Sequence, residues 1–100
     1  MDIAGPQPRN MLQNELAIVE HLLNLLIHRM ILLDDLEAPQ EVLDFFEECI
    51  IIAERIWIVG NEPLTRNGLD VLLNLYRAFF PRYDRLILID VELMDILNNN

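Results

Sequence analysis

The sequence predicts an all-α protein, a small antiparallel bundle of three to four helices that is completed by dimerisation. Three observations lead to this prediction. Apolar residues recur at spacings of three and four along most of the chain, which is the period of a helix buried on one side. Prolines interrupt these repeats where short loops would join neighbouring helices. A chain of 100 residues also has room for only one domain with one modest core.

The first predicted helix, residues 11–33, carries two adjacent apolar stripes. One is a heptad seam with alternating spacings of four and three residues, and it consists of Leu12, Leu16, Val19, Leu23, Leu26, Met30 and Leu33. The second stripe lies beside it and consists of Ile18, Leu22, Leu25 and Leu32, interrupted by Arg29. Because two stripes cover most of a helix's circumference, we expect this helix at the centre of a bundle or at a subunit interface.

A second helix is predicted over residues 40–59. Pro39 separates it from the first, because a proline disfavours helical backbone before it and suits the start of a helix. The same alternating apolar spacing continues in Val42, Phe46, Cys49, Ala53 and Ile56. We place Gly60 as the residue that ends this helix.

Two further helices are predicted beyond a loop around Pro63. The third runs from residue 65 or 67 to residue 80, and we expect Pro81 to stop it. Residues 82–97 are ambiguous, because Leu86–Ile89 has the composition of a buried strand while the apolar residues of the whole segment share one helical face. A lone strand would have no partner in this chain, so we assign the segment as a fourth helix.

The domain boundaries follow from these repeats. Residues 1–10 contain a glycine and two prolines without an apolar period, and we expect a flexible arm there. Residues 11–97 form the single helical domain, and residues 98–100 form a frayed C-terminus.

The composition narrows the classes of partner and the compartment. Seventeen acids against seven arginines give a net charge of −10, which argues against binding to bare nucleic acid or to anionic membranes. The unbroken apolar runs are much shorter than the roughly 20 residues of a transmembrane helix, and no signal peptide opens the chain. With a single cysteine, these features predict a soluble intracellular protein of the cytoplasm or nucleus that does not bind membranes.

The chain offers more apolar surface than one small monomer can bury. The first helix is apolar over more of its width than two neighbours can cover, and Ile51 and Ile58 fall on an otherwise acidic side of the second helix. We therefore predict a homodimer packed through the first helix, with self-association residues Leu16, Val19, Leu23, Leu26 and Met30. A well-filled monomer that tolerates a few exposed isoleucines, or a groove for another protein, are the alternatives.

No catalytic, cofactor or metal site is predicted. His21 and His28 are seven residues apart on one helix, about 10.5 Å along its axis, which is too far to share one metal ion. Cys49 lies at a core position beside Glu47, Glu48 and the apolar run Ile50–Ile52, a setting that raises the pKa of a thiol and makes it a poor nucleophile. We therefore expect a protein that is not an enzyme.

The distribution of charge is the most informative functional feature. Residues 34–54 carry eight acids and no basic residue. This pattern predicts an acidic patch for docking to a basic protein surface, including a nucleic-acid-binding groove that the patch would block by mimicry, although such charge also serves solubility. The predicted patch residues are Glu41, Asp44, Glu47, Glu48 and Glu54. The alternative is a dimeric nucleic-acid-associated regulator that uses Arg66, Arg77, Arg82 and Arg85 on one face.

The residue types that are missing add a hypothesis about the kind of protein. The chain contains no lysine, no serine and one threonine, Thr65, so ubiquitin could be attached only at the N-terminus and few phosphorylation sites remain. A protein that must persist among host degradation machinery would have this composition, as would one whose codons are constrained by an overlapping reading frame. The sequence therefore favours a viral or mobile-element accessory protein or inhibitor that acts by protein–protein interaction.

Overall fold

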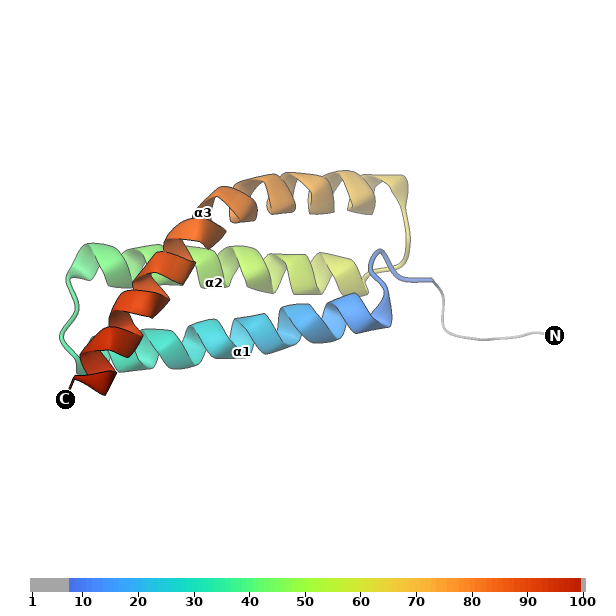
Figure 1. The fold of residues 1–100 in the computed structure, drawn as a ribbon. Coiled ribbons are helices and arrows are strands. Elements are labelled where there is room, and N and C mark those ends of the chain that lie inside the picture. Colours follow the sequence, from blue (N-terminus) through green and yellow to red (C-terminus); the bar gives the residue numbers. More distant parts are fainter. Residues whose placement is uncertain (1–7, 100) are drawn as a thin grey trace.

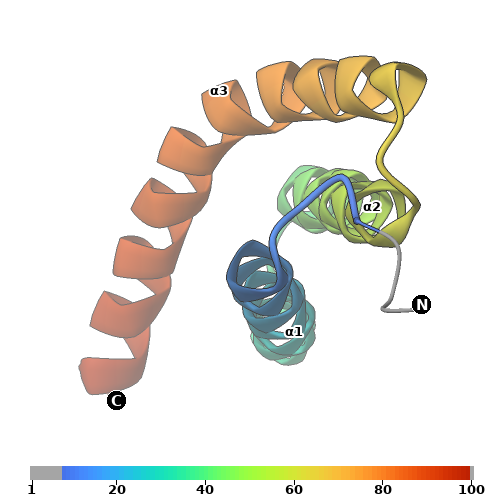
Figure 2. The same ribbon diagram turned by 90° about the vertical axis from the view of Figure 1, so that its right-hand side faces the viewer.

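The computed structural model describes residues 8–99, which form three α-helices: α1 (Gln13–Asp35), α2 (Gln40–Asn61) and α3 (Arg66–Asn98). α1 and α2 lie side by side and run in opposite directions (Figure 1). α3 begins over the C-terminal end of α2, arches across it and descends beside α1 (Figure 2). The predicted all-helical fold is confirmed, with three helices rather than four.

The prediction that Pro81 ends a helix was wrong, because Pro81 lies inside α3, which is 33 residues long in all. Proline has no N–H to donate to the Arg77 carbonyl, and its ring pushes against that turn, so the helix bends there (Figure 2). The helix survives because one buried face runs through the bend. Its buried leucines and phenylalanine recur every seven residues on both sides of Pro81: Leu72, Phe79, Leu86 and Leu93. The same face rules out the strand considered for Leu86–Ile89.

A tight turn reverses the chain between α1 and α2. Glu37 adopts the left-handed backbone conformation with φ of 57°, which lets its N–H donate to the Asp34 carbonyl while the Ala38 N–H donates to the Leu33 carbonyl. These two bonds satisfy carbonyls at the end of α1 in the pattern of a Schellman motif. Pro39 then starts α2, as the sequence predicts.

The segment before α1 is tied to the loop between α2 and α3. Pro8 accepts a hydrogen bond from the Leu64 N–H, and the Asn10 side chain donates to the Val59 carbonyl and accepts from the Thr65 N–H. Residues 8–10 are therefore not part of the expected flexible arm, because Pro8 and the Asn10 side chain are hydrogen-bonded to the end of α2 and to the loop that leads to α3. The rest of that arm, residues 1–7, and the last residue of the predicted frayed end lie outside the described residues.

Gly60 also differs from its predicted role. It lies within α2 instead of ending it, and a β-carbon at this position would come within 2.5 Å of Met11 Sδ. Glycine therefore allows the segment before α1 to pack directly against α2 at this position.

The core lies along α2, which packs against both other helices. Cys49 and Phe46 from α2 and Leu93 from α3 are the largest fully buried side chains. α1 and α3 approach each other much less closely, and this leaves a groove between them.

Candidate protein-interaction surfaces

The outward side of α2 carries the predicted acidic patch. All five patch residues are exposed: Glu41, Asp44, Glu47, Glu48 and Glu54. Ile51 and Ile58 lie on the same side and are 51% and 47% exposed, as the sequence predicts. Arg55, one turn beyond Ile51, marks where the acidic character ends. We call this surface, from Glu41 to Ile58, the acidic face.

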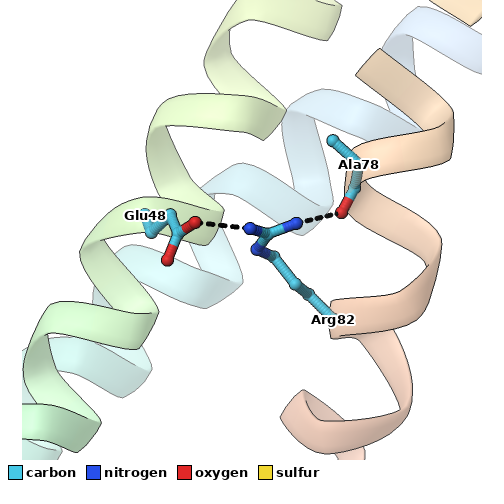
Figure 3. Close-up of polar contacts among 3 residues, drawn as sticks. All are labelled: Glu48, Ala78 and Arg82. Carbon is cyan, nitrogen blue, oxygen red and sulfur yellow. Dashed lines mark hydrogen bonds and ion pairs between the residues drawn. The ribbon is translucent and has the colours of Figure 1, made fainter. Parts of the chain in front are cut away.

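One edge of the acidic face is fixed to α3 by Arg82. Its Nη2 donates to Glu48 Oε1 at 2.5 Å, and its Nη1 donates to the Ala78 carbonyl at 2.5 Å (Figure 3). The guanidinium therefore holds the bent part of α3 against α2. Because both partners are partly exposed, the pair orients the two helices more than it stabilises them.

Arg85 lies at the same edge, with its guanidinium carbon 4.7 Å from the centre of the Phe45 ring. A cation over an aromatic face is attracted by the ring's electron density. Arg82 and Arg85 are thus both engaged with α2, Arg82 through Glu48 and Arg85 through Phe45.

The four arginines proposed for nucleic acid do not form one face. Arg82 and Arg85 lie against α2, whereas Arg66 and Arg77 are exposed elsewhere on α3. Arg66 and Arg85 are separated by 19 residues, or about 28 Å along a helix.

The predicted self-association seam of α1 lies inside the chain. Leu16 and Leu26 are buried, while Val19, Leu23 and Met30 are half-buried and pack against the core. Self-association through this seam would require α1 to leave α2. Exposed apolar side chains remain on α1, but they lie outside the seam: Ile18 and Leu25 belong to the neighbouring stripe, and Ile27 and Ile31 lie elsewhere on the helix.

A groove between α1 and α3 exposes this second stripe. α1 contributes Ile18, Leu22 and Leu25, and α3 contributes Phe80, Tyr83 and Ile87; these six residues are named the apolar strip. Two hollows of about 300 and 200 Å³ follow one another along it and share Leu22 and Tyr83. The sequence signals this surface through the stripe beside the heptad seam, but it does not reveal that α3 leaves that stripe uncovered.

Few charged groups lie along the apolar strip. Arg29 Nε donates to Asp90 Oδ1 at 2.6 Å across one end, so that these two charges neutralise each other. Glu15 lies at the other end, near Tyr76. Burial raises the pKa of the Tyr76 hydroxyl, and the Glu15 carboxylate raises it further. α2 contributes only Phe46, Ala53 and Ile56 to the two hollows, all of them buried.

The structure places the cysteine in the core and the two histidines at the surface. Cys49 is fully buried, and burial raises the pKa of its thiol to about 11, with Glu48 adding to the rise and Arg82 opposing it. His21 and His28 are exposed, and His28 Nδ1 is hydrogen-bonded to the Asn24 carbonyl at 2.7 Å. Within residues 8–99, no group of three or more histidine, cysteine and carboxylate side chains is placed to hold a metal ion.

α1 is also long and apolar enough to cross a membrane, by length and composition. The short unbroken apolar runs did not predict this, because the polar residues of α1 are spread thinly along it. The core helix of a soluble protein and a signal sequence near an N-terminus have the same property, and 17% of the apolar stretch of α1 is buried within the protein.

No protein-family model, curated protein or solved structure matches this chain.

Proposed function

We propose that this protein is a non-enzymatic interaction module, soluble inside the cell, whose acidic face binds a basic surface of another protein. The observation that carries the proposal is the character of the outward side of α2. Five exposed carboxylates lie along this side between Glu41 and Glu54, with exposed Ile51 between the last two of them and Ile58 beyond. Burying apolar side chains drives association, while complementary charge gives speed and choice of partner.

The geometry favours an extended basic partner. Glu41 and Glu54 are 13 residues apart, so the carboxylates span about 20 Å along α2. A partner helix or strand with regularly spaced arginines or lysines matches this length. A nucleic-acid-binding groove is such a basic surface, and occupying it would inhibit the partner, which suits a viral or mobile-element accessory protein.

The alternative, a dimeric regulator that binds nucleic acid itself, has less support. It needs its arginines together, whereas Arg82 and Arg85 contact α2 and are distant from Arg66.

Charge reversal on the acidic face tests the proposal. Glu47→Arg with Glu54→Arg removes two exposed carboxylates without breaking the Arg82–Glu48 pair. We expect binding of a labelled arginine-rich peptide, followed by fluorescence anisotropy at 150 mM salt, to weaken at least tenfold. Circular dichroism should stay unchanged.

The matched control reverses two exposed acids of α3, Asp70→Arg with Asp84→Arg, which changes the net charge equally. If both double variants lose the same affinity, the peptide responds to net charge and the acidic face is not its site.

We also propose that the protein acts as a homodimer. The support is the large apolar surface left exposed by the single chain. The α1 seam that the sequence suggested for this role packs against the core instead, so another surface has to serve.

A further inference from the structure

We propose that the groove between α1 and α3 is occupied by the same groove of a second copy of this chain, through the apolar strip. This inference rests on the homodimer proposed above and is independent of the acidic face. Two of its side chains stand far into solvent: Ile18 is 67% exposed and Phe80 is 62% exposed. Apolar side chains grouped in this way on a folded protein mark a surface that is covered in use.

The charges point to a second copy instead of a basic helix. A partner with clustered lysines or arginines would be drawn to the acidic face, where the carboxylates are. The apolar strip is bordered by a neutralised pair, Arg29 and Asp90, at one end and by the single carboxylate of Glu15 at the other, and it offers such a partner little. A second apolar strip with equally few charges fits this surface better, and the second copy supplies one.

The second copy carries the same charge of −10, so its orientation matters. None of the acidic-face carboxylates lines the two hollows. Contact through the grooves therefore leaves both acidic faces outside the interface and uncovered. Contact through α2 would instead bring two sets of carboxylates together, which like-charge repulsion opposes.

The shape of the strip suits a two-fold contact. In such an interface each residue meets its counterpart across one axis, and both copies use the same surface. Leu22 and Tyr83, which the two hollows share, lie at the centre of the strip and therefore near this axis. The exposed Phe80 and Ile87 on either side of Tyr83 then face the opposite hollow of the other copy.

The area is sufficient for a weak, specific dimer. A fully covered aromatic side chain hides about 150–250 Å², so Phe80 and Tyr83, which are 62% and 42% exposed, each offer on the order of 100 Å². The four aliphatic side chains are smaller and Leu22 is half-buried, so the six residues together contribute about 500 Å² from each copy, and the total of about 1,000 Å² lies where specific interfaces begin. We therefore expect a dimer that dissociates on dilution.

Four matched isoleucine variants test the location of the interface. Ile18→Asp and Ile87→Asp change the strip, whereas Ile51→Asp and Ile58→Asp add the same charge to equally helical, exposed positions on α2. Light scattering across a hundredfold concentration range should show dimerisation weakened at least tenfold in the first pair and close to wild type in the second. Circular dichroism checks that each variant is folded.

A cross-link tests the two-fold geometry without an added charge. Under a mild oxidant, Tyr83→Cys should form a disulfide-linked dimer at concentrations where Leu88→Cys, exposed on α3 outside the strip, does not. Cys49 is buried and stays out of the reaction.

The outcomes separate the two proposals. A wild-type chain that is monomeric at every concentration contradicts the homodimer itself, while leaving the acidic face untouched. A dimer that resists both strip variants contradicts only the groove. If phosphatidylcholine vesicles bind the monomeric wild type but not monomeric Ile18→Asp, the strip docks to membranes and the second copy is excluded.

Discussion

At the scale of single residues, burial decides what each side chain can do. Cys49 is the clearest case, since its sequence position at an apolar register predicted a core thiol and the structure buries it completely. The expected rise in its pKa is also found: its first cause is loss of contact with water, Glu48 adds to the rise, and Arg82 and Arg85 oppose it. The role of the Cys49 thiol is therefore to stabilise the fold.

Cys49 predicts a loss of stability at alkaline pH. Its folded pKa of about 11 is higher than the ordinary value of 9.0, so the protonated thiol stabilises the fold fully below pH 9. This stabilisation is lost as the pH rises from 9 through 11, because the unfolded chain releases the proton first. Between pH 8 and pH 10.5, the free energy of unfolding of the wild type should fall by about 2 kcal/mol more than that of Cys49→Ala.

Chemical unfolding of both proteins at several pH values measures this difference. Cys49→Ala has no ionisable group at the position, so its curve carries the contributions of all other residues. Parallel curves for the two proteins would show that the thiol ionises as easily in the folded state as in the unfolded one.

At the scale of helices, α3 determines the architecture. It packs along α2, bends at Pro81 and then lies beside α1, with Leu86 and Leu93 buried beyond the bend. Arg82 ties the bend to α2, and the Arg29–Asp90 pair ties the second half to α1.

Two leucines beyond the bend test the packing of this second half. Leu93 is 1% exposed, so Leu93→Ala should lower the free energy of unfolding by about 2–5 kcal/mol through loss of apolar contact and the cavity left behind. Leu88 is exposed on the same helix, so Leu88→Ala should cost less than about 1 kcal/mol. Urea unfolding measures both, and equal losses would mean that residues beyond Pro81 do not pack on the core.

The sequence predicts the helices well and the bend poorly. α1 and α2 follow from their apolar spacing, and both begin and end within two residues of the predicted bounds. The local effect of Pro81, which is to break a helix, predicts that the third helix ends there. The recurrence of Leu72, Phe79, Leu86 and Leu93 every seven residues outweighs that effect, because a continuous buried face stabilises the helix through the bend.

The two candidate surfaces also differ in how far the sequence predicts them. Exposure of the acidic face follows from the spacing of its carboxylates along one helix, which local sequence encodes. The groove depends on how α3 bends relative to α1, and these two helices meet through residues far apart in the sequence, such as the Arg29–Asp90 ion pair. The sequence predicts self-association through the first stripe of α1, whereas in the structure this stripe packs against the core.

At the scale of the whole molecule, we place two uses on separate surfaces: the acidic face for a basic protein and the apolar strip for a second copy. These uses respond to salt in opposite ways. Screening weakens attraction between the acidic face and a basic partner, but it relieves repulsion between two copies that each carry a charge of −10. Because the acidic face and the apolar strip share no residues, dimerisation and partner binding can occur together.

The most direct test is the molar mass of the wild-type chain, measured by light scattering over a hundredfold range of concentration at low and high salt. The mass should rise with concentration from 11.7 kDa towards twice that value, and the rise should begin at lower concentration in high salt. A mass of 11.7 kDa throughout, or a dimer that dissociates as salt is added, would contradict an apolar interface between two copies.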